Sequence, residues 1–125
     1  MINILLIGTG GFIGAIARYG VIVGIGKLTS PSFPWSVLTA NVAGSLLIGI
    51  LAGIGESRHL FSTEARLFLF IGVLGSFTTF SSITNDTMVL IRTSNYAGAL
   101  ANIALSLVLG LTAVTIGYAL AKAAT

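Results

Sequence analysis

Four long apolar stretches, separated by short polar or proline-containing connections, constrain the fold of this chain more than any other feature of its sequence. They cover about residues 2–26, 35–54, 67–91 and 96–120. A helix needs about 20 apolar residues to cross the hydrocarbon core of a bilayer. Four such spans use up almost all of the 125 residues. We therefore predict an all-α membrane protein with a single four-span transmembrane domain over residues 1–125.

The composition excludes several other classes of protein. Hydrophobic residues make up 55% of the chain and charged residues 7%, with a mean hydropathy of +1.05, whereas about a quarter of the residues in soluble domains are charged. Disorder needs low hydrophobicity and high charge, and a disulfide-bonded module needs cysteines, of which there are none. The net charge of +3 is too small to indicate nucleic acid. Because the chain has four spans, we expect the lipid bilayer as its partner and an inner or plasma membrane as its location.

The basic residues in the connections give almost no topological bias. Arg18 lies inside the first span and is left out of the comparison. The remaining basic residues are Arg58, Arg66 and Lys122 on one side and Lys27 and Arg92 on the other. Such a small difference either fixes one orientation weakly or allows insertion both ways, which would permit antiparallel dimers. The connection over residues 55–66 holds five titratable side chains, and we expect it to be a polar loop.

Small and polar residues recur at every fourth position in three of the stretches, which indicates close helix contacts. These residues are Gly10 and Gly14 in the first stretch, Asn41, Ser45, Gly49 and Gly53 in the second, and Asn102, Ser106 and Gly110 in the fourth. Helix packing alone explains the glycines. It explains Asn41 less well, because an amide facing lipid is costly.

The third stretch is polar in the middle of the membrane. Seven of its residues between positions 74 and 87 are serine or threonine, and these hydroxyls must face protein or water. Gly75 beside this cluster predicts a helix that is broken near its middle, where freed backbone groups could coordinate an ion or substrate. The alternative is a continuous serine- and threonine-rich helix that hydrogen-bonds to its neighbours.

The polar side chains favour an anion over a cation and offer no enzymatic site. Hydroxyls and the amide of Asn41 can donate hydrogen bonds, and the edges of aromatic rings are electropositive. Arg18 either extends its charge to the membrane surface or faces a wet vestibule that attracts anions, whereas Asp86 has the opposite sign. One histidine and three carboxylates in separate segments can form neither a tetrahedral metal site nor a catalytic triad. We therefore expect a small anion path and no enzyme.

Three segments resemble the CrcB/Fluc family of small fluoride channels. They are GFIGAIARY at 11–19, TANVAGS at 39–45 and GSFTTFS at 75–81. The resemblance implies an antiparallel, dual-topology homodimer in a bacterial inner membrane that exports fluoride passively through two pores and so relieves its toxicity. It also implies a structural sodium ion (Na+) at the centre of the dimer interface.

The resemblance also implies a role for individual residues. The backbone carbonyls of Gly75 and Thr78 would hold the sodium ion. Asn41 would line the pore and hold a phenylalanine or the ion, and Phe80 would present its ring edge to fluoride. The other residues assigned to the anion pore are Thr79, Ser81, Ser82, Ile83 and Ser106, and Arg18 corresponds to the vestibule arginine of the family.

Two positions depart from the family pattern. The pattern has a second phenylalanine three residues after Phe80, where this chain has Ile83. An isoleucine fills similar space but has no polarised ring edge, so we expect the fold to persist and part of the anion site to be lost. We interpret Ile83 as an engineered substitution of phenylalanine, since the residues around it fit the pattern. Asp86 lies near where relatives often carry glutamate, a milder change.

Two other functions compete with the fluoride channel. A small multidrug or guanidinium exporter has a similar length and four spans, but it needs a glutamate embedded in the first span, where this chain has only Arg18. A non-transporting membrane subunit would use its polar residues to contact a larger complex. Ion flux through the purified protein separates these functions.

Overall fold

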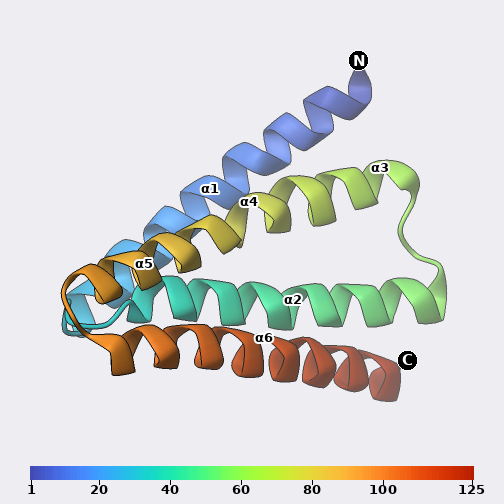
Figure 1. The fold of residues 1–125 in the computed structure, drawn as a ribbon. Helices are drawn as coiled ribbons and strands as arrows, with labels where there is room; N and C mark the ends of the chain where they lie inside the picture. Colours follow the sequence, from blue (N-terminus) through green and yellow to red (C-terminus); the bar gives the residue numbers. More distant parts are fainter.

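The computed structural model describes all residues, 1–125, and is entirely helical (Figure 1). Its elements are α1 (Ile2–Leu28), α2 (Trp35–Arg58), α3 (Thr63–Arg66), the π-helix η1 (Leu67–Leu74), α4 (Gly75–Phe77), α5 (Phe80–Arg92) and α6 (Tyr96–Ala124). Four helices are long and apolar enough to cross a membrane, with residues 63–92 counted as one span. The predicted all-α fold with four membrane-spanning helices is confirmed.

Local sequence explains where the spans end. Thr29 is extended at the end of α1, and Pro34, which has no backbone N–H to donate, precedes the first residue of α2. The backbone of His59 adopts the left-handed conformation that commonly ends a helix, with φ of 51°. Asn95 caps α6, because its Oδ1 accepts a hydrogen bond from the N–H of Gly98 at 2.9 Å.

The spans are arranged as two closely packed pairs. The first half of the third span packs against α1, and α2 lies beside α6 (Figure 1). Glycines allow both contacts: a Cβ added at Gly14 would overlap the backbone of Val73 in η1, and one added at Gly49 would overlap the backbone of Val114 in α6. Small residues let helix backbones approach in this way in a bilayer, where the hydrophobic effect between helices is weak. The predicted packing role of these glycines is confirmed.

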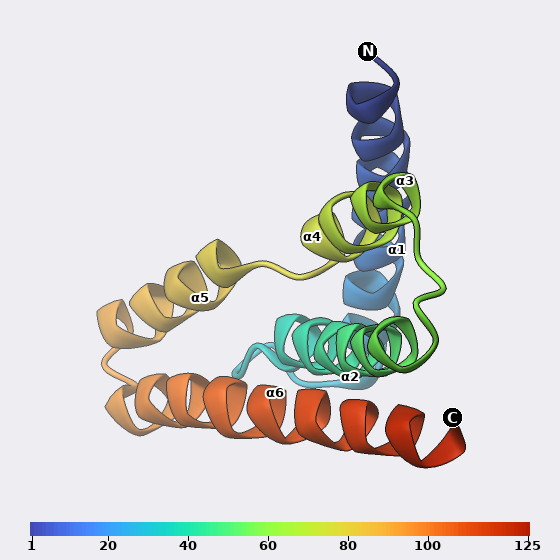
Figure 2. The same ribbon diagram turned by 90° about the vertical axis from the view of Figure 1, so that its right-hand side faces the viewer.

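The third span is interrupted between α4 and α5, and α5 leaves α1 to pack along α6 (Figure 2). Thr78 and Thr79 are extended, with φ/ψ of −95°/149° and −153°/126°. The predicted break near the middle of the third span is confirmed. Gly75 itself is helical, with φ of −62° and ψ of −34°, and the extended residues follow three positions later, where Asn41 pairs with the backbone.

Two other features differ from the sequence analysis. The residues before the break form a π-helix, which the apolar run of residues 67–74 did not predict. Glu56 was expected in a polar loop but lies on the last turn of α2. Its carboxylate accepts hydrogen bonds from Tyr118 Oη at 2.6 Å and Lys122 Nζ at 3.2 Å. Glu56 thus joins the last turn of α2 to the C-terminal part of α6.

Candidate functional site

Asn41 on α2 holds the break in the third span. Its Oδ1 accepts a hydrogen bond from the N–H of Thr79 at 2.9 Å, and its Nδ2 donates to the carbonyl of Thr79 at 3.2 Å. One side chain thus pairs with both backbone groups of a single extended residue. A buried backbone without partners is costly in a membrane, so Asn41 stabilises the open backbone at this position.

The break leaves several backbone carbonyls without hydrogen-bond partners. In a continuous α-helix, the N–H of Thr79 would donate to the carbonyl of Gly75, but here it donates to Asn41. The carbonyl of Thr78 accepts no hydrogen bond from the backbone or from a side chain. The carbonyls of Ser76 and Phe77 also lose their helical partners at the break. The carbonyls of Gly75 and Thr78, which the resemblance assigns to a sodium ion, are thus two of several that the break releases.

A cavity of about 340 Å³ lies between α2, the break and α6. It brings together six of the predicted site residues from three segments of the chain. Its lining residues are Asn41, Gly44, Ser45, Ile48, Leu74, Thr78, Thr79, Phe80, Ile83 and Ser106. The lining contains hydroxyls, an amide and an aromatic ring but no charged residue. A cavity of this composition offers hydrogen-bond donors to a small anion.

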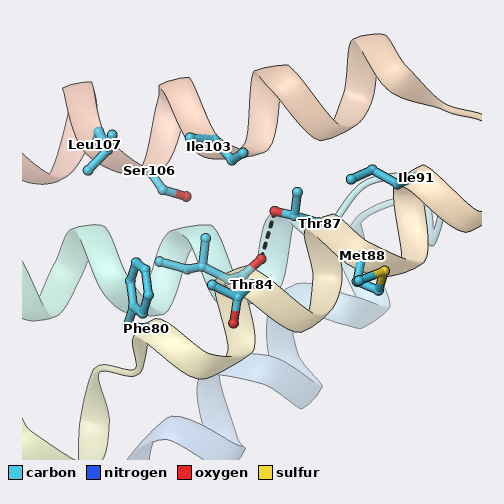
Figure 3. A pocket seen from close by; sticks show the side chains of 9 residues that line it. Phe80, Thr84, Thr87, Met88, Ile91, Ile103, Ser106 and Leu107 are labelled. Carbon is cyan, nitrogen blue, oxygen red and sulfur yellow. Dashed lines mark hydrogen bonds between the residues drawn. The ribbon is translucent and has the colours of Figure 1, made fainter.

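The hydroxyl of Ser106 differs from the others at this cavity because it is buried without a hydrogen-bond partner. Its Oγ is buried and has no hydrogen-bond partner, although nearly all buried polar groups in proteins have one. Ser106 also lines a second cavity of about 370 Å³ between α5 and α6, and its hydroxyl points from α6 toward α5 (Figure 3). Phe80 lines both cavities and is 74% exposed. An unpaired donor and an accessible ring thus line the same two cavities.

A buried amide, not predicted as a site residue, fixes α5 on α6. Asn102 is 2% exposed, and its Nδ2 donates to the carbonyl of Ile83 at 3.3 Å and to Thr87 Oγ1 at 3.0 Å. The hydroxyl of Thr87 in turn donates to the same carbonyl at 2.7 Å (Figure 3). The sequence signal was the repeat of polar residues that Asn102 shares with Ser106. These bonds fix the backbone of Ile83, which lines the same two cavities as Ser106.

The other predicted residues lie outside the cavity at the break. Ser81 is exposed, and its hydroxyl shares a hydrogen bond of 2.8 Å with Thr79 Oγ1. Ser82 is half-buried on α5, and Gly75 is exposed. Arg18 is half-buried on α1 and lines neither of the two cavities. Asp86 also lies outside both, so the negative charge that the sequence analysis singled out is not at the anion site.

Comparison with known proteins identifies the family. The family model described as "CrcB-like protein, Camphor Resistance (CrcB)" matches residues 5–118. The chain belongs to the CrcB-like family. This matched region of the CrcB-like protein contains every residue that lines the cavity at the break. The resemblance that the sequence motifs predicted is confirmed.

Several relatives of this CrcB-like protein are named "Fluoride-specific ion channel FluC". One from Parabacteroides distasonis is 47% identical over 122 residues, covering 98% of this chain and 94% of the relative. One from Agrobacterium fabrum is 45% identical and covers 98% of both chains. One from Nitrobacter winogradskyi is 43% identical over 95% of this chain and 94% of the relative. Together with the four span-capable helices, these matches make the CrcB-like protein a multi-pass membrane protein.

Proposed function

We propose that this protein is a fluoride-selective channel that lets fluoride leave the cell passively across the bacterial inner membrane. The observation that carries the proposal is the unpaired hydroxyl of Ser106, which faces a cavity that contains Phe80 and Asn41 but no charged residue. The identity of the ion comes from relatives that share nearly the whole chain and are named fluoride-specific ion channels. A channel of this kind requires no catalytic residue.

The polar groups of the cavity would replace part of the water around the ion. Fluoride is small, so a selective site must substitute its hydration shell closely. Ser106 has a free hydroxyl, and the amide of Asn41 has a second N–H beyond the one that binds Thr79. The edge of the Phe80 ring would add an electropositive contact. These donors come from three segments of the chain and surround one space.

An antiparallel homodimer with two pores is part of this proposal. The support is the polar surface of α5: Ser81, Thr84 and Asn85 are exposed in a span that would otherwise face lipid. Exposed hydroxyls and amides are costly in hydrocarbon, and a second copy packed against this face would cover them. The weak charge bias of the connections permits the second copy to insert in the opposite orientation.

The carbonyls of Gly75 and Thr78 would hold a structural sodium ion where the two copies meet. The support is that both lack the partners they would have in a continuous helix. Carbonyl oxygens are hard ligands that suit sodium better than a transition metal. Bound there, the ion would coordinate the unpaired carbonyl oxygens and join the two copies.

The test is fluoride efflux from liposomes that contain the purified protein, with chloride as the control ion. We expect efflux of fluoride and not of chloride. Ser106→Ala should slow fluoride efflux about tenfold, because it removes one donor to a charged ion. Thr115→Ala is the matched control: it removes an exposed hydroxyl of the same helix that donates only to the carbonyl of Leu111, and it should not change the rate.

Absence of fluoride efflux from a well-folded protein would overturn the proposal. It would favour an exporter of cations or a non-transporting subunit. Equal efflux from wild type and Ser106→Ala would keep the channel and remove Ser106 from the path.

A further inference from the structure

A third cavity, of about 370 Å³, lies away from the proposed fluoride path. It lies between the end of α1, the connection to α2 and the second half of α5, which meet at one end of the molecule (Figure 1). Its polar side chains come from the connection, the first turn of α2 and α5: Thr29, Ser30, Ser32, Ser36 and Asp86. Thr84 and Thr87 of α5 line the cavity beside α6 instead, so Asp86 occupies the opposite face of this helix.

The carboxylate of Asp86 has no partner within the protein. Its Oδ2 atom is buried and accepts no hydrogen bond. None of the thirteen residues that line the cavity is lysine, arginine or histidine, and the one salt bridge of the protein joins Lys122 to Glu56 at the other end of α2. An uncompensated charge removed from water is strongly unfavourable, so this oxygen requires a partner from solution.

No hydroxyl around Asp86 donates to its buried oxygen. Thr29 Oγ1 donates its proton to the carbonyl of Ile25 at 2.8 Å, so it can only accept from the cavity. The hydroxyls of Ser30 and Ser32 share one hydrogen bond of 3.0 Å, and each still has a lone pair for a ligand. The cavity thus offers hydroxyl and carboxylate oxygens with one formal negative charge and no positive charge, and oxygen ligands suit a hard cation.

We propose that this cavity binds a monovalent hard cation such as sodium, with Asp86 Oδ2 as its charged ligand and the neighbouring hydroxyl oxygens as neutral ligands. A single carboxylate is balanced by a single positive charge, whereas divalent cations are held in proteins by several carboxylates or many oxygens. This site is distinct from the one proposed at Gly75 and Thr78, which uses backbone carbonyls, and it does not depend on which ion the protein conducts. Its effect would be to neutralise the negative charge of α5, whose other end lines the proposed anion path.

The only tryptophan of the chain is a local reporter for this site. Trp35 follows Pro34 and precedes Ser36, which both line the cavity, and its ring lies 4.6 Å from that of Phe33, another lining residue. The experiment follows Trp35 emission of the purified full-length protein in detergent during a titration with sodium chloride, with choline chloride keeping the ionic strength constant. We expect a saturable change in wild type.

Asp86→Asn should raise the half-saturating sodium concentration about tenfold or more, because it removes the charged ligand. Asp86→Glu keeps the charge and should keep a saturable response. Glu64→Gln, which removes an exposed carboxylate on α3, is the matched control and should behave as wild type.

Two results would overturn the proposal. One is a sodium response that is the same in wild type and Asp86→Asn, since the cation would then bind elsewhere. The other is no response in wild type, which would mean that water or a proton satisfies the carboxylate. If Asp86→Asn does not fold, Asp86→Ser, which also removes the charged ligand, takes its place and should show the same loss of sodium affinity. Because the titration contains no fluoride, its outcome is independent of the efflux test.

Discussion

The two halves of the third span are held in the protein by different forces. The first half, residues 63–77, is largely apolar and packs against α1 through glycine contacts in which backbones touch. The second half, α5, carries most of the hydroxyls and is held by the amides of Asn41 and Asn102. Where the first half packs against α1, the two backbones leave no room for even a Cβ. Attachment by a few hydrogen bonds leaves cavities beside the helix and polar groups without partners, which is what an ion path requires.

Disrupting the contact between α1 and the first half of the third span should have the largest effect, and the effect should be on stability. We expect Gly14→Val to destabilise the fold by about 3 kcal/mol, because the new side chain would overlap the backbone of Val73, which cannot move aside. The thermal midpoint and the yield of monodisperse protein in detergent measure this. Gly8→Ala is the control, since a Cβ at Gly8 meets no atom within 4 Å, and it should be neutral. A stable Gly14→Val protein would contradict the rigid packing of this half.

Disrupting the hydrogen bonds between Asn41 and Thr79 should lower fluoride efflux strongly and destabilise the fold only slightly. Asn41→Asp keeps an acceptor for the N–H of Thr79 but loses the donor to its carbonyl. It also introduces a carboxylate into the proposed anion path. We expect fluoride efflux to fall about 100-fold or more while the protein stays folded. Asn3→Asp, an exposed substitution of the same kind near the N-terminus, should have no effect on efflux. Undiminished efflux from Asn41→Asp would mean that Asn41 does not line the path.

A side-chain change within α5 that leaves the hydrogen bonds of Asn41 and Asn102 intact should have the smallest effect on fluoride efflux. Ile83 and Ser106 line both cavities beside α5. We expect Ile83→Phe to raise fluoride efflux about threefold, because a ring edge adds a weak contact to the anion. Wild type and Ile83→Phe are compared in the same liposomes. Equal rates would show that Phe80 alone supplies the aromatic contact.

The apolar spans and the broken third span could be predicted because each depends on residues close together in the sequence. The residues that become extended at the break could not be predicted. They are Thr78 and Thr79 because Asn41, 38 residues before Thr79, pairs with the opened backbone. The π-helix escaped prediction for a similar reason: nothing in residues 67–74 distinguishes it, while Gly72 within it lies against Gly10 of α1. The interpretation of Ile83 as an engineered substitution stays a prediction.

The sequence by itself determined that the chain lies in a membrane, that its third span is polar at mid-membrane, and to which family it belongs. Those properties are sums over local composition and motifs. Only the tertiary structure decided which polar groups are satisfied: Thr79 by Asn41 and the carbonyl of Ile83 by Asn102, while Ser106 and Asp86 are left without partners. The physical reason is that a hydrogen bond needs two groups at one point in space, and in this fold the two come from distant segments of the chain.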